Sequence, residues 1–269
     1  MNRRIALAKH WLFHSKNQIS LFELLAKMLE KTCDIKAKPF IDEISEEGEY
    51  LKVKLKDMPD FLYYPKKMAL RSLYQVITES TDKKQWHYYE IPETQVMVND
   101  VVVDCGAAEG LFSLMVANRC EEVYAIEPLP QFTLSMEKTF SNYNNVHIIP
   151  CALSDKTGSA FIDEHDISST ISSNGSVAVE LETIDNLFYR KGIKVNYLKA
   201  DLEGFEMDML NGASETIKHS KPKIAITTYH KAEHADEIRR FLLNIHPDYK
   251  LKVKGIEERA GAPVMLHAW

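Results

Sequence analysis

The residues best suited to chemistry occur in two short runs, and the first has the form of a ligand-binding turn. The apolar residues Val101–Val103 lead into Asp104-Cys105-Gly106-Ala107-Ala108-Glu109-Gly110, and an amphipathic segment follows. This pattern predicts a buried parallel strand, a tight turn and the start of a helix. Gly106 lets the backbone approach a ligand closely, where a Cβ would intrude. The N–H groups at the helix start are free to bind that ligand.

An acid further along the chain completes this first signal. Glu127 ends a second apolar pattern, Val123–Ile126. An acid about twenty residues after the turn can accept hydrogen bonds from both hydroxyls of an adenosine ribose. The glycines follow Gly-x-x-x-Gly rather than a dinucleotide pattern, and Asp104 would repel a pyrophosphate but tolerates a cationic sulfonium. We therefore expect S-adenosylmethionine rather than NAD, with a purely structural turn as the alternative.

The second run delivers a lysine and three acids to the end of another predicted strand. Lys199-Ala200-Asp201-Leu202-Glu203-Gly204-Phe205-Glu206 directly follows apolar residues. In open α/β sheets, ligands bind outside the carboxyl ends of the strands. A hydroxyl acceptor must lose its proton, and the candidate catalytic residues are Asp201, Glu203 and His230. Asp201 and His230 are favoured equally as the base, and Lys199 is expected to pair with a neighbouring acid.

Two metal sites are alternatives to this assignment. Asp201, Glu203 and Asp185 could hold a divalent cation such as magnesium, which would lower the pKa of the acceptor. Separately, His230-Lys231-Ala232-Glu233-His234 fits the H-x-x-E-H pattern of some zinc peptidases. No third zinc ligand is suggested, and His230 lies close to a predicted strand end. We therefore assign no metal ligand from the sequence and keep a divalent cation as an open alternative.

The two runs need an alternation of strands and helices to position them. Strand patterns occur at 101–104, 122–127, 145–149, 195–200, 222–227, 248–254 and 262–267, and helical segments are expected between the first five. This alternation predicts a parallel sheet with helices on both faces. The gap between the last two strands is too short for a parallel crossover, which predicts an antiparallel edge. The fold class is therefore α/β, with a mostly parallel Rossmann-like sheet.

The chain divides into two parts by pattern. Residues 1–95 form an N-terminal helical and mixed region, expected to help build the acceptor site, and residues 96–269 form the cofactor-binding domain. The aromatic run Phe61–Lys67 is expected to be a lid over the core or a wall of the acceptor cleft. The cluster Trp86–Glu90 is expected to pack on the cofactor or in the core. The serine-rich segment Asp163–Gly175 is expected to be an active-site loop or a plain surface loop.

Composition sets limits on the class of protein. The chain has 269 residues, of which 45% are hydrophobic and 27% charged, and a net charge of −6. A negative net charge does not favour binding to nucleic acid or to an anionic membrane. The four cysteines form no C-x-x-C pair, no apolar run is long enough to cross a bilayer, and no signal-peptide cleavage pattern follows the N-terminus. We expect a cytoplasmic protein without a nucleic-acid or membrane partner.

Taken together, the motifs resemble the FkbM family of S-adenosylmethionine-dependent methyltransferases. The family pattern D-x-G-A-x-x-G matches the run that begins at Asp104, and K-x-D-x-E-G-x-E matches the run that begins at Lys199. Between them lie Glu127-Pro128, Ala152-Leu153-Ser154-Asp155 and Thr183-Ile184-Asp185 in the same order. The resemblance covers roughly residues 98–268 and implies the sheet of a class I methyltransferase.

The resemblance also implies roles for individual positions. The glycine-containing loop would hold the methionine and ribose parts of the cofactor, and the segment that begins at Ala152 would lie against the adenine. Asp201 and Glu203 would line the space between the sulfonium methyl group and the acceptor. The residues so assigned to the cofactor are Asp104, Gly106, Ala107, Gly110, Glu127, Ala152, Ser154 and Asp155.

The expected activity is methyl transfer to an oxygen. The resemblance implies an O-methyltransferase that acts on a hydroxyl of a small molecule, such as a sugar or a secondary metabolite. An NAD-dependent oxidoreductase is one alternative, but the Tyr-x-x-x-Lys pair that would support it does not follow the fourth strand. A non-catalytic protein that retains the cofactor pocket is another. The oligomeric state stays open.

Overall fold

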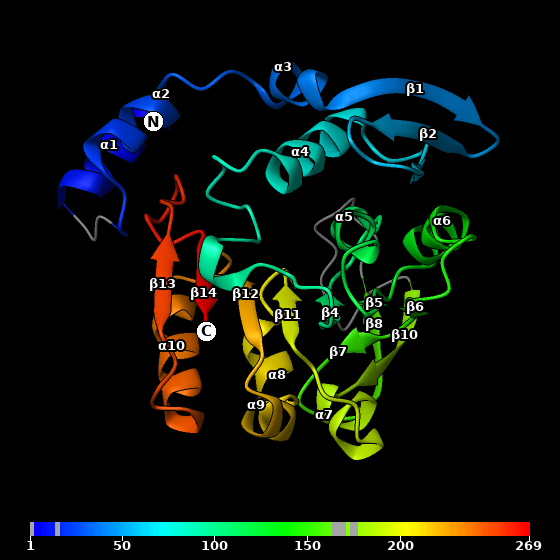
Figure 1. The fold of residues 1–269 in the computed structure, drawn as a ribbon. Helices are drawn as coiled ribbons and strands as arrows, with labels where there is room; N and C mark the ends of the chain where they lie inside the picture. Colours follow the sequence, from blue (N-terminus) through cyan, green and yellow to red (C-terminus); the bar gives the residue numbers. More distant parts are fainter. Residues whose placement is uncertain (1–2, 14–16, 163–170, 173–176) are drawn as a thin grey trace.

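The computed structural model describes residues 3–13, 17–162, 171–172 and 177–269, and its centre is a seven-stranded sheet (Figure 1). The strands lie in the order β13 (Leu251–Lys254), β14 (Met265–Ala268), β12 (Lys223–Thr227), β11 (Tyr197–Ala200), β4 (Val101–Cys105), β5 (Glu122–Ile126) and β6 (Val146–Ile149). The five strands from β12 to β6 are parallel, and β14 is antiparallel to both of its neighbours. The predicted α/β class and the antiparallel edge are confirmed.

Alternate residues of the central strands enter two different cores. Val103 and its neighbours on one face pack against α7 (Ile184–Leu187), α8 (Glu206–Asn211), α9 (Ser214–Ser220) and α10 (His234–Ile245). Val102 and its neighbours on the other face pack against α5 (Leu111–Ala117). Successive side chains of a strand point to opposite faces, so a strand covered on both sides reads as a continuous apolar run.

A second sheet interrupts the expected alternation of strands and helices. Between β6 and β11 lies a four-stranded sheet in the order β7 (Ala152–Leu153), β10 (Val177–Glu182), β8 (Gly158–Ile162) and β9 (Ile171–Ser172). The sequence prediction of a helix here was wrong apart from the short α7. β7 and β9 have only two residues each, and most residues of β8 and β10 are exposed or half-buried, so the periodicity is weak. Of the predicted loop Asp163–Gly175, only Ile171–Ser172 lies within the described residues.

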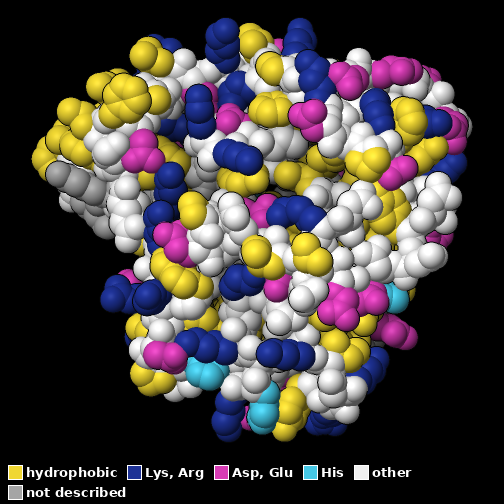
Figure 2. Space-filling model, viewed as in Figure 1, with side chains coloured by type: hydrophobic (Ala, Val, Ile, Leu, Met, Phe, Trp, Pro, Cys, Tyr) yellow, Lys and Arg dark blue, Asp and Glu magenta, His cyan; other side chains and the backbone are white. Residues whose placement is uncertain are grey.

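The N-terminal region forms a layer over one end of the large sheet (Figure 1). It contains α1 (Arg3–Phe13), α2 (Leu21–Met28), α3 (Cys33–Ala37), the antiparallel strands β1 (Ile41–Glu47), β2 (Tyr50–Leu55) and β3 (Phe61–Pro65), and α4 (Leu70–Thr81). Buried side chains of β2, β3 and α4 share one core with α5 and with α6 (Pro130–Thr139). Several apolar side chains of α1 and α2 are exposed, and Figure 2 shows them gathered at the upper left.

Both aromatic segments contribute to the core, which was one of the two alternatives predicted for each. The run Phe61–Lys67 contains β3, which packs against α6, where Tyr63 N–H donates to Thr139 Oγ1 at 3.0 Å, and the run lines neither of the cavities described below. Trp86 is core, packed with Leu7, Ile19 and Leu24 of the N-terminal helices. Within the described part of the chain, no helix has the length and apolar character needed to cross a bilayer.

Candidate active site

The first motif forms a tight loop between β4 and α5. Gly106 has φ +72°, and its N–H and that of Ala107 both donate to the Ile126 carbonyl at 3.0 Å. A Cβ on Gly106 would lie 2.1 Å from the carbonyl oxygen of Asp201. Glycine is therefore required both by the backbone conformation and by the close approach of the end of β11. The loop brings the two sequence motifs into direct contact.

A buried ion pair ties the two motifs together. Lys199 Nζ lies 2.9 Å from Asp104 Oδ1 and donates to the Gly106 carbonyl at 2.6 Å. The other Asp104 oxygen accepts from Ser113 Oγ at 2.8 Å. Burial alone would lower the pKa of Lys199, but Asp104 and Asp201 raise it above its ordinary value, so it stays charged. The predicted pairing of Lys199 with an acid is confirmed.

The ion pair with Lys199 gives Asp104 a different role from the one that the sequence suggested. Its side chain is fully buried, and it does not line either cavity of the site. The sequence argument assumed that the charge of Asp104 would repel a pyrophosphate and tolerate a sulfonium. Lys199 compensates that charge, so Asp104 gives no reason to prefer one ligand over the other. Its carboxylate instead fixes the loop and the first turn of α5.

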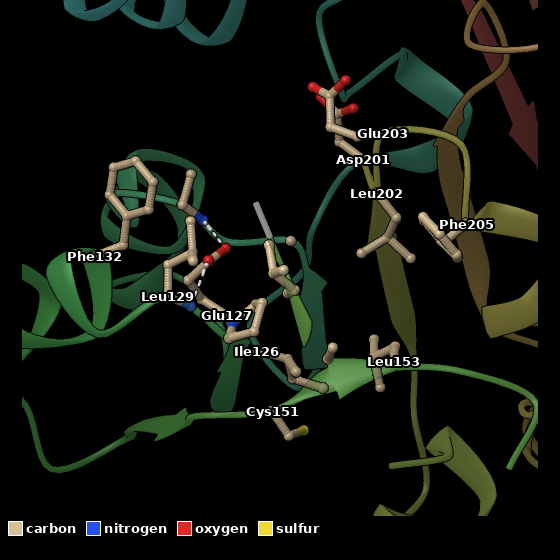
Figure 3. A pocket seen from close by; sticks show the side chains of 15 residues that line it. Ile126, Glu127, Leu129, Phe132, Cys151, Leu153, Asp201, Leu202, Glu203 and Phe205 are labelled. Carbon is tan, nitrogen blue, oxygen red and sulfur yellow. Dashed lines mark hydrogen bonds between the residues drawn. The ribbon is translucent and has the colours of Figure 1, made fainter. Parts of the chain in front are cut away.

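Glu127 closes the loop from the side of β5. Its Oε2 accepts from the N–H of Ala108 at 3.0 Å, and its Oε1 accepts from the N–H of Leu129 at 3.0 Å (Figure 3). Ala108 has φ +46°, an unfavourable conformation for alanine that this contact helps to hold. Burial raises the pKa of Glu127 to about 7. The carboxylate is therefore poised to gain from further hydrogen-bond donors.

An apolar cavity opens beside Glu127. Its walls include Leu129, Phe132, Cys151, Leu153, Ile162 and Phe205, and Glu127, Asp201 and Glu203 supply its carboxylates (Figure 3). We call this space the apolar cavity. It joins one buried acid to a set of apolar surfaces, the combination that a nucleoside requires.

A second, acidic cavity begins on the other side of the loop. Four carboxylates, those of Glu79, Glu109, Asp201 and Glu203, line it together with the polar side chains Ser72, Gln75 and Ser80 of α4. Lys199 and Arg259 supply its cations. The two cavities share Gly106, Ala108, Asp201 and Glu203, so they meet where β4 and β11 end.

Asp201 stands at this junction in a ring of donors. Its Oδ2 accepts from Tyr89 Oη at 2.9 Å and lies 3.5 Å from His87 Nε2, and its Oδ1 accepts from Thr227 Oγ1 at 3.1 Å. Burial alone would raise the pKa of Asp201, but His87, Lys199 and His230 hold it below its ordinary value. The cluster around Trp86 thus contributes His87 and Tyr89 to the Asp201 side of the site.

Glu206 organises the rest of the second motif. Its buried Oε1 accepts from the N–H of Leu202 at 3.1 Å and lies 2.8 Å from His230 Nδ1, and its Oε2 lies 3.3 Å from His234 Nδ1. Burial would raise the pKa of Glu206, but the two histidines hold it well below its ordinary value. The H-x-x-E-H pattern is thereby explained, because both histidines face one carboxylate.

His230 points its other nitrogen toward the acids at the junction. Nε2 lies 3.3 Å from Glu203 Oε2 and 3.9 Å from Asp201 Oδ1. Burial alone would lower the pKa of His230, but Glu203 and Glu206 raise it to about 10. The ring is therefore protonated at neutral pH, which leaves it unable to accept a proton in the ligand-free protein.

Comparison with known proteins identifies the family. The model of the methyltransferase FkbM domain matches residues 104–251, which is more than half of the chain. This chain belongs to the FkbM methyltransferase family. No curated protein sequence matches it significantly.

Several solved structures are similar to this member of the FkbM family, and the first of them supports its fold. Methyltransferase FkbM from Methylobacillus flagellatus KT is 22% identical, with a TM-score of 0.51, over 74% of this chain and 54% of that one. The chain thus spans about half the length of that protein. TYW2 from M. jannaschii, in complex with AdoMet, is 15% identical with a TM-score of 0.44, over 84% and 88% of the two chains. An rRNA methylase from Streptococcus thermophilus is 12% identical with a TM-score of 0.43, over 64% and 87%.

The FkbM motifs do not all reach the cavities. Gly106, Glu127 and Ala152 line the apolar cavity, and Ala107 lines the acidic cavity. Gly110 starts α5 with φ +84° and lines neither.

Two further predicted positions bond to each other beside the sheet. Ser154 Oγ donates to Asp155 Oδ1 at 3.2 Å, and neither residue is in a cavity lining. Asp185 is remote from Asp201, because it accepts from the N–H groups of Glu215 and Thr216 at the start of α9. The predicted metal set with Asp185 is not brought together.

Sequence reasoning missed several residues of the site. Glu206 stands in the second motif, so its position in the pattern was an available signal. Tyr89 and Glu79 come from the N-terminal region; Tyr89 lies in the aromatic cluster Trp86–Glu90 but its contact with Asp201 was not foreseen, and no local pattern marks Glu79. Glu109 lies inside the first motif, where its burial could not be foreseen from a polar residue type.

Replacement of Gly106 tests the contact between the motifs. Gly106→Ala places a Cβ against the Asp201 carbonyl and should destabilise the protein by about 1–3 kcal/mol more than the matched control Gly192→Ala. Gly192 has the similar φ of +70° but open space around it, so the control isolates the backbone cost. Chemical denaturation measures both values. Equal losses in the two variants would contradict the close approach.

The raised pKa of Glu127 predicts a stability that depends on pH. Its pKa rises from 4.5 to about 7 on folding, so its contribution is fully present below 4.5 and is lost as the pH rises through 7. Glu127→Gln removes that loss. The variant should gain about 3 kcal/mol over wild type between pH 4.5 and 8, measured by denaturation across this range. Glu122→Gln, at the other end of β5, is the control, and a pH-independent difference would refute the assignment.

Proposed function

We propose that this FkbM methyltransferase transfers a methyl group from S-adenosylmethionine to a hydroxyl oxygen of a small polar molecule. The observation that carries the proposal is the meeting of two unlike cavities at Asp201 and Glu203. One cavity suits a nucleoside, and the other suits a hydroxylated or cationic molecule. Their junction is where a transferred group would pass.

The residues of the apolar cavity fit the methyl donor. Glu127 offers two carboxylate oxygens for the ribose hydroxyls, and the surrounding apolar side chains suit an adenine ring. Glu109 lines the adjoining cavity, is 2% exposed, and its Oε2 has no hydrogen-bond partner among the described residues. A buried carboxylate without a donor is costly, so this atom suits the ammonium of the methionine part.

The chain's own residues would orient the reactants and handle the proton. When bound, S-adenosylmethionine supplies an electrophilic methyl group on a sulfonium. Asp201 is ionised and held by Tyr89 and Thr227, so it can accept the hydrogen bond and then the proton of an acceptor hydroxyl. His230 is already protonated in the ligand-free protein, which favours Asp201 as the base. Positioning in such a site contributes up to about 7–11 kcal/mol, and a base roughly 10²–10⁴-fold.

The acidic cavity favours a small molecule over a nucleic acid. Its four carboxylates would repel a phosphodiester backbone, and the net charge of −6 acts in the same direction. The polar side chains of α4 offer hydrogen-bond partners for several hydroxyls, which supports a sugar or a hydroxylated secondary metabolite. In this proposal residues 1–95 build one wall of the acceptor site and residues 96–269 bind the donor.

A reducing compartment is consistent with the thiols of the protein. All four cysteines are free, and Cys105 and Cys151 are buried. Burial raises the pKa of Cys151 to about 12, which keeps its thiol protonated and unreactive. We propose that the enzyme works in the cytoplasm.

Loss of Glu127 should weaken donor binding. Glu127→Ala removes a charged acceptor of the ribose hydroxyls and should cost about 1.5–3 kcal/mol, which is roughly 10–100-fold in the affinity for S-adenosylhomocysteine. Titration calorimetry measures this, with Glu122→Gln as the control and NADH as the competing ligand. Unchanged affinity would remove Glu127 from the site, and preferential binding of NADH would favour an oxidoreductase.

Loss of the Asp201 charge should separate turnover from donor binding. Asp201→Asn should lower the rate of S-adenosylhomocysteine formation by about 10²–10⁴-fold, with the acceptor found by screening hydroxylated small molecules. Its affinity for S-adenosylhomocysteine should stay within a few fold of wild type. Asp208→Asn on α8, which lines neither cavity, is the control. Normal turnover in the Asp201 variant would exclude it as the base.

A further inference from the structure

Three donor atoms converge at the junction of the two cavities. A carboxylate oxygen of Asp201, one of Glu203 and a ring nitrogen of His230 all lie within 4.8 Å of one another. Two ligands about 2.1 Å from one cation lie about 3.0–3.4 Å apart when they are adjacent. His230 Nε2 and Glu203 Oε2, at 3.3 Å, already have this separation. A cation would need little rearrangement of these atoms to bind all three, and it would displace the proton from His230 Nε2.

The histidine is oriented for this purpose by its own carboxylate. Glu206 Oε1 receives Nδ1–H of His230 at 2.8 Å, which turns Nε2 toward Asp201 and Glu203. The His230 side chain is 10% exposed, and its Nε2 is buried and makes no hydrogen bond of good geometry with the described residues. Metal-binding histidines typically donate their other ring N–H to a carboxylate in this way.

The two acids are also held in place. Tyr89 donates to Oδ2 of Asp201, and Thr227 donates to Oδ1. Each carboxylate oxygen keeps a further lone pair that can bind a cation. Glu203 has φ +51°, and Glu206 binds the N–H groups of its neighbours Leu202 and Gly204. Figure 3 shows the carboxylates of Asp201 and Glu203 side by side at the rim of the pocket. The set is preorganised rather than scattered over a mobile surface.

We propose that Asp201, Glu203 and His230 form a binding site for a divalent first-row transition cation such as Mn²⁺. Two carboxylates and one imidazole suit Mn²⁺ and its neighbours, because an all-oxygen set would be expected for magnesium. The set replaces the sequence hypothesis in which Asp185 was the third ligand. Asp201 and Glu203 line the acidic cavity, so the cation would face the acceptor; this last step rests on the proposed function.

Binding of Mn²⁺ to the chelator-treated full chain tests the site directly. Titration followed by the electron paramagnetic resonance signal of free Mn²⁺ should give one bound ion per chain. Glu203→Gln should weaken this binding about tenfold or more. Glu203 is the best variant because its side chain is partly exposed, at 28%, so that its loss should leave the fold intact, which the unfolding temperature checks. Pulsed resonance should detect nitrogen coupling from His230 that disappears in His230→Gln.

The matched control separates a built site from a general attraction to negative charge. Glu79→Gln removes another carboxylate of the same cavity that is not in the ligand set, and it should leave Mn²⁺ affinity within a few fold of wild type. Absence of a bound ion, equal losses in the Glu79 and Glu203 variants, or binding without nitrogen coupling would each overturn the proposal. Calorimetry with S-adenosylhomocysteine is run separately on the wild-type protein. If the protein binds Mn²⁺ but not S-adenosylhomocysteine, the proposed function is contradicted and this inference stands.

Discussion

A buried cation joins the ends of the two central strands, β4 and β11. Lys199 contacts Asp104 and the Gly106 carbonyl, and Gly106 in turn lies against the Asp201 backbone. A lysine that is 4% exposed is stable only with such partners, because removal of one would leave an uncompensated buried charge. The loop between β4 and α5 and the acids after β11 therefore occupy one fixed arrangement. Both cavities and the junction between them depend on it.

Several acidic side chains lie near Lys199, and neighbouring groups compensate their charges to different degrees. Glu206 is matched by two histidines, and Asp201 by hydrogen bonds and nearby cations. Glu109 and Glu127 are different, since burial raises the pKa of each to about 7. Burial disfavours the charged form of both, so these carboxylates would gain from a ligand that brings hydrogen-bond donors or positive charge. At Glu109 and Glu127, therefore, the buried charge that lowers the stability of the ligand-free protein is the same charge that favours ligand binding.

Local patterns were enough to predict the strands of the large sheet, the glycine loop and the place of Glu127. Each of these follows from periodicity and from the rule that parallel strands end at one edge of the sheet. The sequence argument from Asp104 reached the same cofactor for an inadequate reason, because pairing with Lys199 is a long-range contact that spacing does not reveal. The contributions of Tyr89 and Glu79 depend on how the N-terminal layer lies on the sheet. The small sheet of β7 to β10 escaped prediction because its strands are short and weakly periodic.

The central claim is that the loop after β4 and the end of β5 bind the methyl donor. Hydrogen exchange of backbone amides, followed by mass spectrometry with and without S-adenosylhomocysteine, tests it at the level of these segments. The account predicts slower exchange in peptides that contain Gly106, Ala108, Glu127 and Leu129, which line the apolar cavity. Unchanged exchange there, or protection confined to other parts of the chain, would contradict it.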